Sequence, residues 1–64
     1  MKAKTFAQAS YQWSCYVQDN MGSVMNEHSY PFEELSEEKV TVWILKNNYG
    51  VLCVIDKETG EVVT

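Results

Sequence analysis

The sequence predicts a single α+β domain, residues 1–64, in which one helix packs on a face of a small antiparallel sheet in the order β-β-α-β-β. Three observations support this prediction. The chain has 64 residues, which is enough for one domain only. Residues 11–18 alternate between apolar and polar side chains, as a half-buried strand does. Residues 36–48 carry signals for both the start and the end of a helix.

The first two strands are expected at 11–18 and 23–30. The apolar side of the first consists of Tyr11, Trp13, Cys15 and Val17. Residues 19–22 follow, and their Asn and Gly suit a hairpin turn. The second strand alternates poorly and ends at Pro31, because proline cannot donate to a strand ladder. Tyr16 would lie on the uncovered face of this sheet, so we expect it to form a dimer contact.

Residues 36–48 fit two interpretations. In the helical one, Ser36 is the N-cap, Glu37 and Glu38 complement the helix dipole in the first turn, and Gly50 stops the helix. In the competing one, the β-branched run 40–45 is a strand. The run is apolar on both sides and fits neither template cleanly. The end signals favour the helix.

The last two strands are expected at 51–55 and 61–64. Val51–Ile55 is a continuous apolar run, which is typical of a central strand. The polar residues 56–60 form a tight turn, and a short edge strand returns after it.

The charge of the chain limits the kinds of partner it can bind. Nine acidic residues face five lysines, with no arginine, so the net charge is −4. Proteins that bind nucleic acids or anionic membranes neutralise phosphates with Lys and Arg, so neither is expected as a direct ligand. A basic partner protein fits better, although acidity also simply keeps a protein soluble. Neither a signal peptide nor a membrane span is recognisable, which predicts a cytoplasmic protein.

Catalytic and metal-binding groups are poorly represented. His28 is the single histidine, and beside Glu27 it resembles a surface residue more than a general base. Cys15 and Cys53 are expected to be free thiols that pack as small hydrophobes. Neither a paired-cysteine zinc motif nor an acidic calcium loop occurs. We therefore expect no enzymatic activity, no metal and no cofactor.

The acidic residues concentrate in one short segment. Five of the nine fall between Glu27 and Glu38, interleaved with aromatic and aliphatic residues. One interpretation is a solvated loop and helix start, with Phe32 and Leu35 packed into the core. The other is a negatively charged, partly apolar surface that fits a basic groove. The partner-binding residues predicted by the second interpretation are Glu27, Tyr30, Phe32, Glu33, Glu34, Leu35, Glu37 and Glu38.

Several short motifs resemble the small uracil-DNA glycosylase inhibitors of certain Bacillus phages. They comprise Phe6, then Ser10–Tyr11 followed by six strand residues, then Gln18–Asp19 and Gly22. Leu35–Ser36–Glu37 follows about a dozen residues later, so the similarity covers roughly residues 6–45. It implies a homodimeric phage protein that fills the DNA cleft of the host enzyme with carboxylates.

The resemblance also implies an apolar pocket that traps the leucine which the enzyme inserts into the duplex during base flipping. The family has Phe-Glu in the first helical turn, where this chain has Glu38 and Lys39. Phe32–Glu33 would have to supply that chemistry instead. The leading prediction is thus a DNA-mimic inhibitor of uracil-DNA glycosylase. The alternatives are a phage anti-CRISPR protein that blocks a nucleic-acid groove and a small structural or assembly module.

Overall fold

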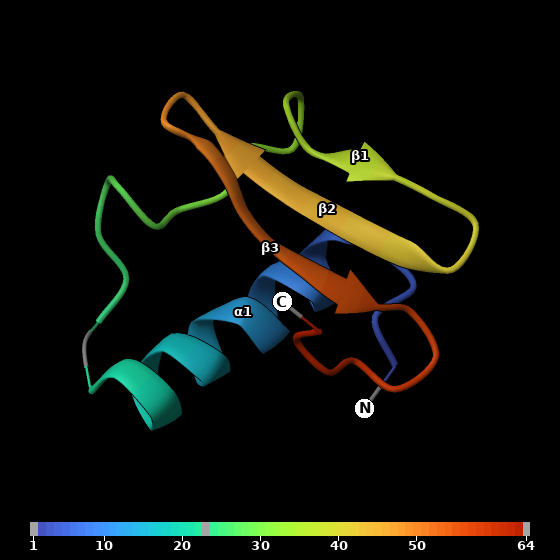
Figure 1. Ribbon diagram of the computed structural model, residues 1–64, viewed down its shortest axis with the longest axis horizontal. Helices are drawn as coiled ribbons and strands as arrows, with labels where there is room; N and C mark the ends of the chain where they lie inside the picture. Colours follow the sequence, from blue (N-terminus) through green and yellow to red (C-terminus); the bar gives the residue numbers. More distant parts are fainter. Residues whose placement is uncertain (1, 23, 64) are drawn as a thin grey trace.

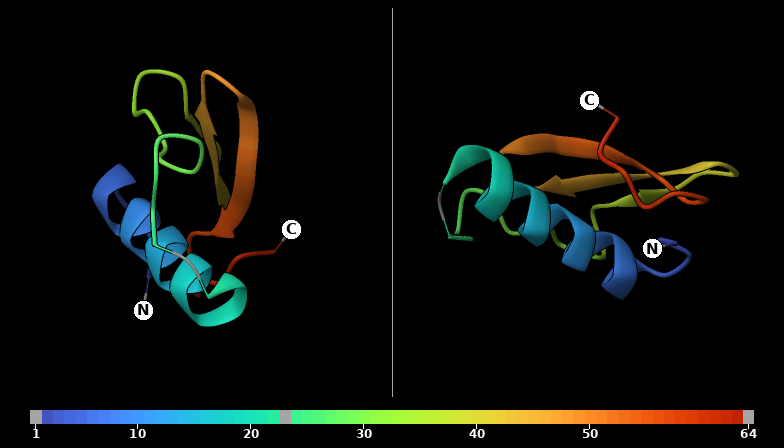
Figure 2. Two further views of the ribbon diagram at one scale, coloured as in Figure 1. Left: turned by 90° about the vertical axis from the view of Figure 1, so that its left-hand side faces the viewer. Right: turned by 90° about the horizontal axis from the view of Figure 1, so that it is seen from below.

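The computed structural model, which describes residues 2–22 and 24–63, has one helix followed by three strands (Figure 1). The elements are α1 (Phe6–Met21), β1 (Glu37–Glu38), β2 (Val42–Asn47) and β3 (Gly50–Asp56). They form two layers, with α1 packed across one face of an antiparallel sheet of order β1-β2-β3 (Figure 2). The predicted α+β class is confirmed. The predicted order β-β-α-β-β is wrong, because the helix comes first.

Residues 11–18, predicted to be a strand, belong to α1. Thr5 caps the helix: its hydroxyl accepts from the backbone N–H of Gln8, and the Gln8 side chain accepts from the Thr5 N–H in return. Gly22, with φ of 64°, ends the helix in the left-handed conformation. Ala9, Trp13 and Val17 recur every fourth residue and are buried. The same residues also fit the alternating pattern of a strand. The helix forms because Thr5 and Gly22 cap its two ends.

Residues 24–36 form turns, so the predicted second strand is also wrong; its first residue, Ser23, lies outside the described residues. The side chain of Asn26 accepts from the N–H of His28 (2.8 Å), and the hydroxyl of Ser29 accepts from the N–H of Asn26 (3.0 Å). Such local bonds offer the backbone an alternative to a sheet ladder. They close a turn where the sequence pattern indicated a strand.

The segment expected to be a helix over 36–48 contains β1 and β2 instead. The competing interpretation, a strand over 40–45, agrees with β2 but did not include β1. The residues of β2 alternate between half-buried and buried, as a strand with two unequal faces does. Ser36 does not cap a helix, since its hydroxyl accepts from the N–H of Lys46 in β2. Gly50, with φ of 119°, lies in the tight β2–β3 hairpin rather than at a helix end.

The predicted strand at 51–55 is confirmed as part of β3, although β3 ends the sheet order rather than lying at its centre. Trp43 pairs with Ile55, and Leu45 with Cys53, before a bulge shifts the register. The predicted turn after β3 is confirmed by the bond from the Gly60 N–H to the Asp56 carbonyl. The edge strand predicted at 61–64 is reduced to an isolated bridge between Val62 and Ile55, and its last residue, Thr64, lies outside the described residues.

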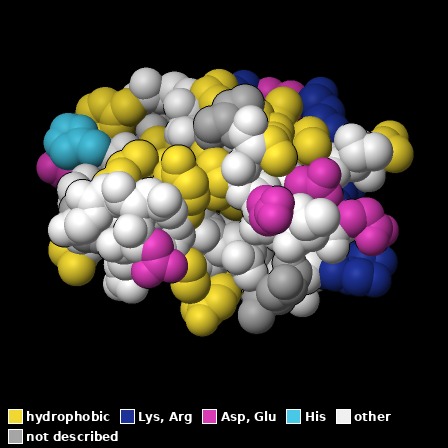
Figure 3. Space-filling view, turned by 60° about the horizontal axis from the view of Figure 1, so that its bottom comes forward, with side chains coloured by type: hydrophobic (Ala, Val, Ile, Leu, Met, Phe, Trp, Pro, Cys, Tyr) yellow, Lys and Arg dark blue, Asp and Glu magenta, His cyan; other side chains and the backbone are white. Residues whose placement is uncertain are grey.

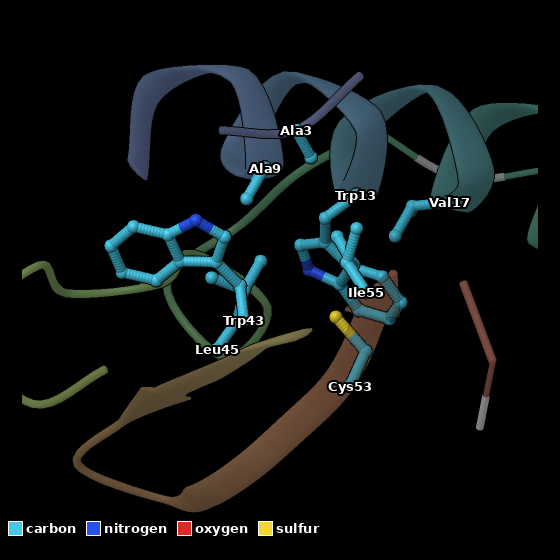
Figure 4. Close-up of a cluster of buried hydrophobic side chains, with 8 residues drawn as sticks. All are labelled: Ala3, Ala9, Trp13, Val17, Trp43, Leu45, Cys53 and Ile55. Atoms are coloured by element: carbon cyan, nitrogen blue, oxygen red, sulfur yellow. The ribbon is translucent and has the colours of Figure 1, made fainter. Parts of the chain in front are cut away.

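The core lies between α1 and the sheet, and it is small (Figure 4). Leu45, Cys53 and Ile55 contribute its largest fully buried side chains. The complete buried cluster consists of Ala3, Ala9, Trp13, Val17, Trp43, Leu45, Cys53 and Ile55. No helix in the described part of the chain is long and apolar enough to cross a membrane.

Candidate partner-binding surface

Residues 30–35 form a compact loop, which we call the acidic turn. The N–H groups of Leu35 and Ser36 both donate to the carbonyl of Phe32, at 3.1 and 3.0 Å. The hydroxyl of Ser36 donates to the same carbonyl at 2.8 Å. These three bonds wind the segment into a single tight turn that holds Glu33 and Glu34 at its tip.

The acidic turn is fastened to β2 on one side. The Phe32 N–H donates to the Lys46 carbonyl at 2.8 Å, and the Lys46 N–H donates to the hydroxyl of Ser36 at 3.0 Å. The buried amide of Asn47 donates to the carbonyls of His28 and Tyr30, each at 3.0 Å. This network positions the turn as a side extension of the sheet.

A further bond fastens the preceding loop to the helix. The indole N–H of Trp13, a core residue of α1, donates to the Ser29 carbonyl at 2.8 Å. The loop that leads into the acidic turn is therefore bonded to both layers of the fold.

The acidic turn exposes apolar side chains together with its acids. Tyr30 is 55% exposed, Phe32 36% and Leu35 40%, and Glu33 and Glu34 are exposed as well. The interpretation in which Phe32 and Leu35 pack into the core is therefore wrong. Exposed apolar side chains on an ordered loop are typical of binding surfaces when they cluster.

Glu37 and Glu38 belong to β1 and have lysine partners. Glu37 forms ion pairs with Lys46 and with Lys39 (3.1 Å), and Glu38 pairs with Lys57 (2.8 Å). The hydrogen bonds from Lys46 and Lys39 lower the pKa of Glu37. These two carboxylates are neutralised within the chain, so they contribute less to a negative surface than the sequence suggested.

Glu27, Glu33 and Glu34 have no lysine partner in the part of the chain that the structure describes. Glu27 lies 3.8 Å from the imidazole of His28, and both side chains are exposed. In the space-filling view the visible lysines and most of the visible acidic side chains lie towards the same end of the molecule (Figure 3). The carboxylates of Glu33 and Glu34 are thus available to a partner, as are those of three exposed acids outside the turn, Asp19, Glu58 and Glu61.

Two features of this surface escaped sequence reasoning. Asn47 positions the loop from inside the sheet. A sequence pattern that places an amide at a buried position of a strand could have indicated this role. An apolar groove of about 350 Å³ opens beside Tyr30, between α1 and residue Met25 of the loop. Its lining residues are Phe6, Ala7, Ser10, Tyr11, Ser14, Met25 and Tyr30.

Tyr16, the predicted dimer contact, lies on α1 rather than on a sheet face. Its ring stacks on Trp13, with ring centroids 5.7 Å apart, and it is half-buried against the core. It also lines a groove of about 510 Å³ between α1 and residues 59–62.

The residues weighed for catalysis lie in unrelated environments. Burial raises the pKa of the Cys53 thiol to about 12, so this thiol stays protonated and unreactive. Cys15 lies on α1, whereas the ring of His28 packs on that of Tyr49, with ring centroids 4.5 Å apart. Among the described residues, no three His, Cys, Asp or Glu side chains are grouped so as to hold a metal ion.

Comparisons of the chain with models of known protein families, with curated proteins and with solved structures gave no match. The motifs behind the resemblance to glycosylase inhibitors occupy different elements from those expected. Ser10–Tyr11 and Gln18–Asp19 lie in α1, where the resemblance required a strand. Leu35–Ser36–Glu37 leads into β1 rather than into a helix.

Proposed function

We propose that the protein is an inhibitory binding protein that presents the acidic turn to a basic, nucleic-acid-binding groove of its target. The observation that carries this proposal is the acidic turn itself. Hydrogen bonds to β2 hold it in place, and the loop that leads into it is bonded to α1, yet the side chains of Tyr30, Phe32, Leu35, Glu33 and Glu34 are exposed.

Preorganisation is what makes this turn a suitable ligand. A loop that is already ordered loses little conformational freedom on binding, so more of the contact energy appears as affinity. Tyr30, Phe32 and Leu35 provide the apolar contact, and aromatic residues are frequent hot spots. The carboxylates of Glu33 and Glu34 take the places of two phosphates, and the net charge of −4 accelerates the encounter with a positive groove.

Uracil-DNA glycosylase is the first target to assay, because the sequence resemblance implies it. The experiment measures uracil excision from DNA with wild-type protein added at equimolar concentration. Strong inhibition supports the proposal in its specific form. Undiminished excision rejects this enzyme as the target, and the same protein is then assayed against CRISPR effectors, the rival class.

The charge of the turn is tested by replacing Glu33 and Glu34 together with Gln. Removal of two interfacial charges should weaken binding to the target by roughly tenfold or more, since each is worth about 1 kcal/mol or more at a contact. The matched control replaces Glu58 and Glu61, two exposed acids outside the turn, with Gln. If both double variants bind as the wild type does to every candidate, the mimicry proposal is wrong and a structural module is favoured.

The apolar part is tested separately with Phe32→Ala and Leu35→Ala. We expect each to cost about 1–2 kcal/mol of binding free energy, as truncation of a central contact does. Val40→Ala is the control, because Val40 is 93% exposed and lies outside the turn.

A further inference from the structure

The face of the sheet that points away from α1 has no element over it in the described chain. Figure 2 shows the two layers edge-on, with the helix on one side of the sheet and only the end of the chain projecting on the other. The strand alternation places Val42 and Ile44 of β2 on this face, because their neighbours Trp43 and Leu45 are buried against α1.

Two more branched aliphatic residues extend this outer face. Val54 of β3 pairs with Ile44, so the two side chains are cross-strand neighbours. Val63 lies beside Val54, with a 2.8 Å bond from its N–H to the Val54 carbonyl, and it is 52% exposed. An antiparallel sheet with one solvated face normally carries polar residues there. The apolar centre formed by Val42, Ile44, Val54 and Val63 is what an interface requires. Asp56, the cross-strand partner of Val42, and Lys46, which is paired with Glu37, lie on the same face at its margin.

Charged side chains border this apolar centre on its two long sides, with an ion pair on one side and a carboxylate on the other. On the β1 side, Lys39 lies beside Val42, bonded through its N–H to the Val42 carbonyl, and its ammonium reaches Glu37, which is opposite Ile44. On the other side, Glu61 lies beside Asp56, whose N–H donates to the Glu61 carbonyl. Glu61 points to the outer face because the next residue, Val62, packs against the core.

We propose that the outer face binds the outer face of a second copy of this chain. A two-fold axis parallel to the strands exchanges the two long sides of the face. It therefore sets Lys39 opposite the partner's Glu61, and by symmetry the same contact forms twice. Ile44 meets the partner's Val54 across the centre. The pattern is self-complementary, which identifies a second copy as the occupant.

An interface of ordinary size would cover a large part of this small molecule. A stable interface buries about 800 Å² per protomer, which is about a fifth of the 4113 Å² surface of this chain. Two sheets packed face to face lie about 10 Å apart and interdigitate their side chains. The dimer would give a 64-residue chain a second core that its own residues do not provide.

Sedimentation equilibrium of the full chain tests the apolar centre. At about 1 mM protein, the wild type should have twice the 7.4 kDa mass of one chain, whereas Val54→Asp should be monomeric. Val40→Asp, the same change at an exposed position off the face, should remain dimeric. A monomeric wild type overturns the proposal, and so does a dimer that Val54→Asp leaves intact. Tyr16→Ala then tests the helix surface instead.

Charge reversal tests the contact directly and does not depend on the folding of Val54→Asp. Lys39→Glu and Glu61→Lys should each weaken the dimer by about tenfold, because each places like charges together twice. The double variant Lys39→Glu with Glu61→Lys should dimerise more tightly than either single variant, because opposite charges face each other again, although the new carboxylate at position 39 lies beside Glu37. Glu58→Lys is the control for a change of charge alone and should leave the dimer intact. If the loss of dimerisation free energy in the double variant equals the sum of the losses in the two single variants, the proposed pairing is wrong.

Discussion

Asn47 is the residue on which the acidic turn depends most. Its side chain, buried at the end of β2, donates to the carbonyls of His28 and Tyr30 and accepts from the N–H of Tyr49. One amide thus satisfies three backbone groups that no strand or helix pairs. A buried polar group retained in so small a core is explained by this positioning role.

Replacing Asn47 with Ala should therefore destabilise the protein and loosen the turn. Three backbone groups lose a partner, two of them carbonyls at a partly buried site, so we expect a loss of about 2–3 kcal/mol. Urea unfolding measures the stability, and binding to the target should weaken in parallel. Asn48→Ala, at the exposed neighbouring position, is the control. Equal stability of the two variants would contradict the assigned role.

The pH dependence of stability should contain a contribution from Glu37. Its pKa is lowered from 4.5 in the folded protein by Lys46 and Lys39. A group with a depressed folded pKa stabilises the fold fully above its unfolded pKa and loses this contribution as the pH falls through the folded value. Glu37→Gln should consequently flatten the decline in stability below pH 4.5. Urea midpoints measured between pH 6 and pH 3 would show it, with Glu58→Gln as the control; parallel declines would refute the assignment.

At the scale of the elements, the prediction placed a strand where α1 lies and a helix where β1 and β2 lie. The Thr5–Gln8 capping box and Gly22 were readable signals of a helix at residues 6–21, but the alternation of Tyr11–Gln18 concealed them. Ser36 comes directly before β1 and Gly50 begins β3, and both residue types also suit helix ends. Local preferences were ambiguous in both segments, and the pairing of β2 with β3 decided the outcome.

The acidic turn was more predictable than the elements around it. The clustering of acids with Tyr30, Phe32 and Leu35 is a property of composition, and it survives the change of secondary structure. The pairing of Glu37 and Glu38 with lysines was not predictable, because Lys46 and Lys57 approach them only through the sheet register. The run 40–45 is apolar on both sides and fitted neither template. In β2 one side, Trp43 and Leu45, packs into the core, and the other, Val42 and Ile44, lies on the outer face.

Loss of the capping box should destabilise α1 in a measurable way. Thr5→Ala leaves the N–H of Gln8 without its side-chain acceptor, and we expect a loss of about 1 kcal/mol in the free energy of unfolding. Thermal unfolding followed by helical circular dichroism measures it, and Thr41→Ala at an exposed loop position is the control. Thr5→Ser should retain most of the stability; a large loss in that variant would show that the methyl group matters rather than the hydroxyl.

At the scale of the whole molecule, the fold has one small core and an outer sheet face with apolar residues at its centre. If that face forms a dimer, unfolding is coupled to dissociation, and the melting temperature must rise with protein concentration. We expect such a rise for the wild type and a concentration-independent, lower melting temperature for Val54→Asp. Calorimetry over a hundredfold range of concentration, about 10 μM to 1 mM, would resolve it. A constant melting temperature for the wild type would contradict the dimer.

The two cysteines provide a chemical probe that requires no engineering. Cys53 lies at the centre of the core with its thiol protonated, whereas Cys15 is only half-buried, beside a groove on α1. A thiol reagent at mild pH should modify Cys15 in the native protein and reach Cys53 only when the sheet and helix separate. The first label therefore marks the native helix surface. The rate of the second reports how often the molecule opens, with each chain recording its own unfolding as a permanent covalent modification.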